Sequence, residues 1–216
     1  MSKKILLGTI MGLLNAGCSL VGKSDVEGPS YKVILKQDNK EIRQYAEYVV
    51  AKTTVRGKFK DAQGEGFRIL AGYIFGKNES RQKMTMTAPV VQRPESEKIS
   101  MTAPVVMSPN QDSTWTMTFS MPSAYTLETL PVPTDKRIQI EKVQGKTVAA
   151  LTFSGLWNES KNTEKGTELT EWLKNFQEYA PSSPPMFAGY NPPWTLPFFR
   201  RNEILIDLTQ KNDPRP

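Results

Sequence analysis

The chain has 216 residues, of which 38% are hydrophobic and 23% are charged, as expected for one globular domain with its own core. The net charge is +6, but the basic residues are scattered rather than gathered into a run, which argues against a nucleic-acid-binding protein. Histidine is absent and Cys18 is the only cysteine, so the sequence excludes an internal disulfide and any catalytic mechanism that needs histidine.

The first residues have the pattern of a secretory signal. Lys3 and Lys4 precede an apolar run, ILLGTIMGLL, which is too short for a membrane span and is followed by NAGC. A lone cysteine after Ala-Gly resembles a bacterial lipobox, in which Cys18 is lipidated and becomes the mature N-terminus. Asn15 stands where such boxes usually carry leucine, and the alternative is a plain signal peptide that is cleaved nearby.

We therefore predict a signal peptide with a lipobox-like end (1–18), a tether (19–30), one folded domain (31–210) and a short tail (211–216). Ser19 follows the cysteine, and in bacteria with two membranes a residue other than aspartate there resembles an outer-membrane address. The prediction is an exported lipoprotein, held by its lipid at the periplasmic face of the outer membrane.

Short strands and two helices alternate along the domain. The strand-like segments, rich in β-branched residues or alternating in polarity, are YKVILKQ (31–37), EIRQYAEYVVAKTTVRG (41–57), WTMTFSM (115–121), KRIQIEKV (136–143), KTVAALTFSG (146–155) and NEILIDL (202–208).

The two helices are expected at 64–76 and 165–180. The expected sheet-facing residues are Phe67, Leu70, Ala71 and Ile74 in the first, and Leu169, Trp172, Leu173 and Phe176 in the second, which Pro181 should end.

The strand and helix pattern repeats. AKTTVRGKF (51–59) matches AALTFSGLW (149–157) at an offset of 98 residues, and each copy is followed by a helix. The repeat predicts two βαβ-like halves related by an approximate twofold axis. Because the turns are too short for parallel crossovers, the fold class should be α+β, a twisted antiparallel β-barrel or sheet flanked by two helices.

A shorter phrase, MTAPV, occurs at 86–90 and again at 101–105, 15 positions later. Proline lies at strand ends, edges or bulges, so the two Ala-Pro steps should bend two strands alike and place Met86 and Met101 at related positions. Two interpretations stay open, that the methionines fill the core and that some line a ligand surface.

Several phrases together resemble the SOUL/haem-binding-protein family: EIRQY (41–45), GFRILAGYIFG (66–76), the doubled MTAPV, FSMPSAY (119–125), LPVPTD (130–135), FSG (153–155) and YNPPWTLPFFRRNE (190–203). The resemblance covers about residues 31–208. It implies a twisted antiparallel β-barrel of two repeats with two helices, similar to the ligand-binding domains of multidrug-sensing bacterial regulators. It also implies non-covalent binding of haem or another tetrapyrrole rather than catalysis.

Because the chain lacks histidine, haem would have to be held by apolar contacts and by basic residues at its propionates. The helix at 64–76 is apolar nearly all round, and the predicted ligand-binding residues are Arg68, Ile69, Tyr73, Phe75 and Lys77, with Arg68 at the position that the family resemblance associates with haem. The alternative is that a loop, such as 76–85 or 182–197, covers this face.

The segment 190–203 combines aromatic and cationic residues. Tyr190, Trp194, Phe198 and Phe199 are expected to plug one end of the barrel, while Arg200 or Arg201 pairs with Glu203 or contacts a propionate. The alternative functions are a binder of other amphiphilic molecules and a protein-interaction module of the cell envelope. We predict no enzyme and no metal site, because the sequence has no legible carboxylate pair, P-loop or nucleophile elbow.

Overall fold

The computed structural model describes residues 26–81, 96–192 and 194–211. The elements in chain order are β1 (Tyr31–Gln37), β2 (Lys40–Tyr45), β3 (Tyr48–Arg56), α1 (Phe59–Ile74), β4 (Asn78–Glu79), β5 (Val105–Pro109), β6 (Thr114–Ser120), β7 (Val132–Pro133), β8 (Gln139–Val143), β9 (Lys146–Phe153), α2 (Glu159–Leu173), β10 (Tyr179–Pro181), β11 (Met186–Gly189), the 3-10 helix η1 (Pro197–Phe199) and β12 (Asn202–Gln210).

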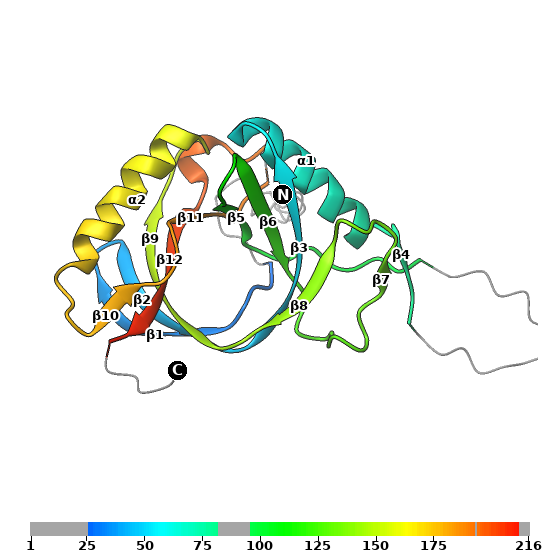
Figure 1. Cartoon of the computed structure of the whole chain (residues 1–216), viewed down its shortest axis with the longest axis horizontal. Coiled ribbons are helices and arrows are strands. Elements are labelled where there is room, and N and C mark those ends of the chain that lie inside the picture. Colours follow the sequence, from blue (N-terminus) through cyan, green and yellow to red (C-terminus); the bar gives the residue numbers. More distant parts are fainter. Residues whose placement is uncertain (1–25, 82–95, 193, 212–216) are drawn as a thin grey trace, which may run out of the picture.

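One curled antiparallel sheet forms the body of the protein, in the order β1-β2-β9-β12-β11-β5-β6-β3-β8, with β10 beside β12. Figure 1 shows the two helices on the outer, convex side of this sheet. The prediction of an antiparallel α+β fold with two helices is confirmed. The sheet is a half-barrel, however, because β1 and β8 end the order and do not pair with each other.

The predicted twofold relation is visible in the strand order. Exchanging β2 with β8, β3 with β9, β5 with β11 and β6 with β12 reverses the eight strands that follow β1 in the order and leaves their pairing unchanged. Gly57 and Gly155, at equivalent positions between strand and helix, have φ values of 137° and 120°. Side chains rarely tolerate such angles, so glycine is needed at the same turn in both halves.

The helices begin one hundred positions apart, at Phe59 and Glu159, and both start earlier than the sequence predicted. The second start is fixed by Asn158, whose side chain accepts a hydrogen bond from the backbone N–H of Lys161. The predicted end of the second helix is wrong, because α2 ends at Leu173 and residues 179–181 instead form β10 on the edge of β12.

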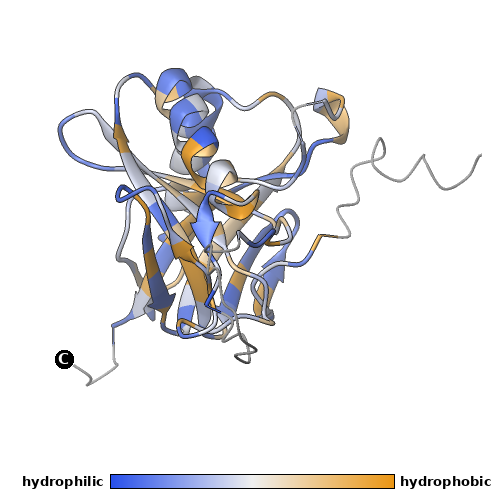
Figure 2. Ribbon diagram, turned by 90° about the vertical axis from the view of Figure 1, so that its right-hand side faces the viewer, coloured by the Kyte–Doolittle hydropathy of each residue, from blue (hydrophilic) through white to orange (hydrophobic). Residues whose placement is uncertain are grey.

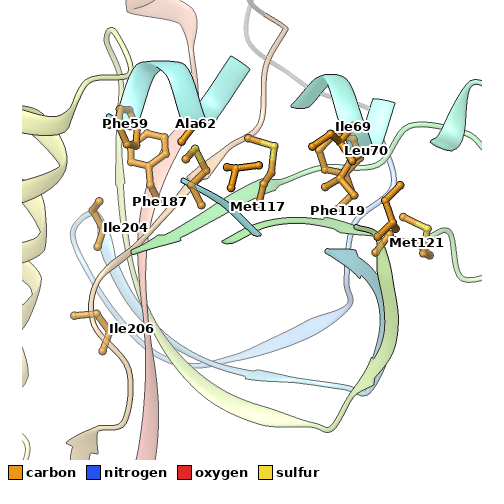
Figure 3. Close-up of a cluster of buried hydrophobic side chains, with 14 of the residues drawn as sticks. Phe59, Ala62, Ile69, Leu70, Met117, Phe119, Met121, Phe187, Ile204 and Ile206 are labelled. Atoms are coloured by element: carbon orange, nitrogen blue, oxygen red, sulfur yellow. The ribbon is translucent and has the colours of Figure 1, made fainter. Parts of the chain in front are cut away.

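The main core lies between the helices and the convex face of the sheet. Figure 3 shows Ile69 and Leu70 of α1 pointing toward Phe119 of β6. A smaller cluster around Tyr45 and Leu205 covers part of the opposite face. Strand β6 alternates as predicted, because Met117 and Phe119 are buried in the main core while Thr116 and Thr118 are only partly buried.

The first MTAPV copy, residues 86–90, lies outside the described residues, and so does the expected relation between Met86 and Met101. Met101 in the second copy is 37% exposed and does not fill the core. The signal peptide, Cys18 and most of the tether also lie outside the described residues. Within the tether range, the Glu27 carbonyl accepts a hydrogen bond from the Ala103 amide, so this part lies on the body.

Candidate ligand-binding site

Helix α1 is held from two sides, and this decides which of its residues can meet a ligand. Its inner side packs on β3 and β6, where Gly66 permits close approach, since a β-carbon there would come within 3.0 Å of Met117 Cβ. The second side is covered by residues 97–99 and by Pro131, because the Ile99 amide donates to the Ile74 carbonyl at 2.8 Å. Only a narrow stripe of the helix remains open.

Two of the predicted ligand contacts lie in the core, and the expectation that they face outward is wrong. Ile69 is 7% exposed and Tyr73 is 1% exposed. The Tyr73 hydroxyl donates to the Pro131 carbonyl at 2.9 Å, and burial raises the pKa of this phenol. Asn78 lies within the predicted covering loop 76–85, and its side chain donates to the carbonyls of Tyr73 and Glu97. The loop therefore covers the side of α1 that carries Tyr73.

The other three predicted residues remain open to solvent. Arg68 and Lys77 are exposed and form no salt bridge within the described ranges, and Phe75 is 62% exposed. Phe67, expected to face the sheet, is 36% exposed, although its ring still contacts Phe119 at a centroid distance of 5.6 Å.

Two glycines flank Arg68 along the same helix stripe. Gly64 and Gly72 lie four residues before and after Arg68, and no atom of the described ranges stands within 4 Å of a β-carbon built at Gly64. The Lys77 side chain lies across Gly72, with its Cδ 3.1 Å from a β-carbon built there. We call the stripe formed by Gly64, Phe67, Arg68, Gly72 and Phe75, with Lys77 at its end, the α1 outer face. It is partly aromatic and cationic.

A cleft of about 390 Å³ lies between α2 and the sheet, and no residue of α1 lines it. Its floor is apolar and comes from four strands, with Met107, Trp115, Phe187 and Ile204 as the residues that line it. The helix side is formed by small or polar residues, among them Thr163, Gly166 and Thr170. The sequence analysis missed this cleft. A glycine flanked by small polar residues at helical spacing was the available signal.

The charge at this cleft is negative. Glu159 and Glu171 line it, and no lysine or arginine among the described residues does. Asn162 adds a buried side-chain oxygen, Oδ1, that has no hydrogen-bond partner among the described residues. An apolar floor with carboxylates and a free acceptor favours a cationic or hydrogen-bond-donating ligand and disfavours an anionic one.

The opposite face of the sheet carries a buried ionic cluster that the sequence showed only in part. Glu203 is fully buried and accepts two hydrogen bonds from Arg43, at 2.8 and 2.9 Å, and another from Tyr190 at 2.7 Å. Arg201 pairs with the same carboxylate at 2.7 Å, so the prediction of a structural ion pair with Glu203 is confirmed for Arg201. Arg200 instead donates from Nε to the Thr195 carbonyl.

Burial by itself would raise the pKa of Glu203. The hydrogen bonds and positive charges of Arg43 and Arg201 outweigh burial and lower the pKa of Glu203 to about 2. A second cavity, of about 190 Å³, adjoins this cluster and is lined by Tyr31, Tyr190 and Arg201, among others.

The predicted aromatic plug does not form. Trp194 is 74% exposed, Phe198 65% and Phe199 39%, while Tyr190 alone of the four joins the cluster around Glu203. Neither helix of the described ranges is long and apolar enough to cross a membrane. The same ranges contain no group of three or more acidic, histidine or cysteine side chains suited to a metal ion.

Comparison with known proteins gives a family. The model of the SOUL heme-binding protein family matches residues 26–207, most of the chain. The chain belongs to the SOUL heme-binding protein family.

Two relatives are similar in sequence to this chain over most of its length. Heme-binding protein 1 of Xenopus laevis is 31% identical over 205 residues, which cover 94% of this chain and 95% of that protein. Heme-binding protein 2 of Homo sapiens is 32% identical over 175 residues, covering 81% and 79%. This SOUL chain therefore matches its relatives over most of their length.

Solved structures share the fold at low identity. The C-terminal domain of EcmrR has a TM-score of 0.54 and 11% identity, covering 83% of this chain and 98% of that one. A conserved protein from Listeria innocua has a TM-score of 0.51 and 12% identity, covering 79% and 92%. At such low identities, these two structures support only the fold of the SOUL chain and say nothing of its function.

We predict that Glu203→Gln lowers the free energy of unfolding at neutral pH by roughly 3–5 kcal/mol, because Arg43 stays buried without its carboxylate. The pKa of Glu203 is about 2 in the fold against an ordinary 4.5, so its stabilising contribution is present above about pH 4.5 and lost as pH falls toward 2. The variant should therefore lose less stability than the parent across that range. Denaturant unfolding at several pH values measures both effects.

Glu47→Gln is the matched control, because the pair of Glu47 with Lys142 is exposed on both sides. Its stability should change by less than about 1 kcal/mol. Equal losses in the two variants would contradict the role assigned to the buried cluster.

Proposed function

We propose that the chain binds haem or a related tetrapyrrole non-covalently on the α1 outer face, without a histidine ligand. The observation that carries the proposal is membership of the SOUL heme-binding protein family over residues 26–207. The similar proteins from Xenopus laevis and Homo sapiens are named for haem binding. Binding rather than catalysis is the activity that these resemblances support.

The α1 outer face fits the two chemical parts of such a ligand. A tetrapyrrole presents a flat apolar ring and two propionates, which require an apolar contact and cations beside it. Phe75 stands seven residues after Arg68, roughly 10 Å along the helix axis, so aromatic and cationic groups are spaced along one face. The open space above Gly64 lets a planar ring approach the helix backbone there, and the Lys77 side chain that lies across Gly72 places a cation beside it.

The cleft beneath α2 fits the same ligand poorly. It is more enclosed than the α1 outer face, but its carboxylates, Glu159 and Glu171, would repel the propionates. This comparison of charge, rather than of volume, is the reason to assign the tetrapyrrole to the α1 outer face.

Titration with haemin, followed by the Soret absorbance, tests this assignment. Arg68→Glu should weaken haemin binding about tenfold or more, because one charge-assisted hydrogen bond is replaced by repulsion. Lys32→Glu makes the same charge change at an exposed position on β1, away from α1, and should weaken binding far less. Equal weakening in both variants, or no spectral change with the parent chain, would remove the proposal.

A second function is favoured by the cleft itself, which has the volume, apolar floor and negative charge suited to an amphiphilic cation. The flat cationic dye rhodamine 6G should bind there, while anionic fluorescein should not. Thr163→Phe should fill the cleft and weaken dye binding without affecting haemin, whereas Thr163→Ser should leave both unchanged. Fluorescence polarisation measures the dye; competition between dye and haemin would contradict two separate sites.

We also propose that the chain is exported and anchored through a lipid on Cys18, at the periplasmic face of the outer membrane. The basic start, the apolar run and the lone cysteine after Ala-Gly support this. In the native host, the parent chain should fractionate with membranes and carry a lipid mass on a mature N-terminus at Cys18. Cys18→Ser should be released from membranes, and an unmodified N-terminus beyond Cys18 would end the proposal.

A further inference from the structure

Large apolar side chains gather on the exposed surface at one end of the half-barrel. They come from the loop before β12 and from the turn after β9, and the exposed fractions are 74% for Trp194, 65% for Phe198, 58% for Leu156, 45% for Leu196 and 39% for Phe199. We call these five residues the aromatic patch. A soluble protein rarely leaves so many neighbouring large apolar side chains in water without a partner for them.

Hydrogen bonds hold the loop in this exposed conformation. The Gly155 amide donates to the Pro197 carbonyl at 2.9 Å, which joins the two segments of the patch. Arg200 Nε donates to the Thr195 carbonyl at 2.7 Å, and the Arg201 amide donates to Asn191 Oδ1 at 2.6 Å. The side chains are therefore presented outward by an ordered backbone, which avoids an entropic cost on binding.

The shape of this region is a projection rather than a groove. Figure 2 shows the apolar turn of η1 standing out from the body in the side view. Arg200 and Arg201 follow the turn directly, and the charge of Arg201 is paired with the buried Glu203. A projecting tip of tryptophan, phenylalanine and leucine side chains suits entry into the interface of a bilayer.

The start of the described chain lies at the base of this turn. Val26, Tyr190 and Arg201 line one cavity, so the polypeptide reaches the body beside the root of the loop. Cys18, the proposed lipidation site, stands eight positions before Val26. The predicted tether that carries the lipid and the aromatic patch thus join the body at neighbouring places.

We propose that the aromatic patch inserts into the interfacial layer of a lipid bilayer and holds the body against the membrane surface. The inference is independent of the tetrapyrrole proposal, because the patch shares no residue with the α1 outer face. The lipid surface is favoured over a protein partner by the projecting shape of the turn and by the nearby entry of the tether that carries Cys18.

Tryptophan fluorescence of the full chain tests the insertion, whatever the N-terminal segment contributes. The probe is vesicles of phosphatidylcholine and phosphatidylglycerol whose acyl chains are brominated near the head group, because bromine quenches only tryptophans that enter the bilayer. The parent chain should be quenched. Trp194→Phe should lose that quenching, since Trp115, Trp157 and Trp172 are at least partly buried in the body.

Two further variants make the test specific. Phe198→Ser keeps Trp194 but removes a neighbouring anchor, so its quenching should fall well below that of the parent. Ile34→Ser removes an apolar side chain that is 51% exposed on β1 and should be quenched like the parent.

Several outcomes would overturn the proposal. They are equal quenching of the parent and Trp194→Phe, no quenching at all, and no binding to the vesicles. A concentration-dependent dimer without lipid, lost in Phe198→Ser, would assign the patch to self-association instead.

Discussion

The packing of α1 between β6 and the 97–99 segment is the constraint on which the rest of the structure depends. Ile69 is held against the sheet and Tyr73 is fixed to Pro131, so the helix cannot rotate about its own axis. What remains for a ligand is the α1 outer face. Gly64, Arg68 and Lys77 are exposed on this face because most apolar residues of the helix are already used by the core.

The twofold architecture gives the protein two different surfaces from one plan. Gly66, Ile69 and Tyr73 of α1 correspond to Gly166, Leu169 and Leu173 of α2, and all six residues are buried. The helices differ in the rest of their surface.

Helix α1 fills its share of the core and leaves a cationic outer face, whereas the small residues of α2 leave the acidic cleft. The charges of the ionic cluster around Glu203 are paired with one another, so the cluster adds charge to neither of these two surfaces.

Residue patterns predicted the architecture because local rules determine it. The 98-residue offset between Gly57 and Gly155 reflects a backbone angle that both halves require, and the alternation in β6 reflects burial of one face. The orientation of α1 was predicted wrongly, because a helical wheel allows for one packed side while residues 97–99 and Pro131 add a second. Aligning the helices by Gly66 and Gly166 would have placed Ile69 and Tyr73 in the core.

Two other features depended on contacts that are distant in sequence. The cleft exists because α2 begins at Glu159, capped by Asn158, and brings Thr163 over the sheet, a start that the apolar stripe alone does not reveal. Trp194 and Phe198 are exposed although their side chains are hydrophobic. Their position follows from backbone hydrogen bonds that fix the loop, such as that of Gly155 with Pro197.

The central claim is that the α1 outer face holds the tetrapyrrole, and the paramagnetism of ferric haemin tests it most directly. In a nuclear magnetic resonance spectrum of the complex, iron broadens the signals of nearby nuclei. The account predicts that the amides of Gly64, Arg68 and Gly72 broaden beyond detection while that of Gly166 at the cleft stays sharp. Broadening confined to Gly166 and Phe187, with the α1 signals unchanged, would contradict it.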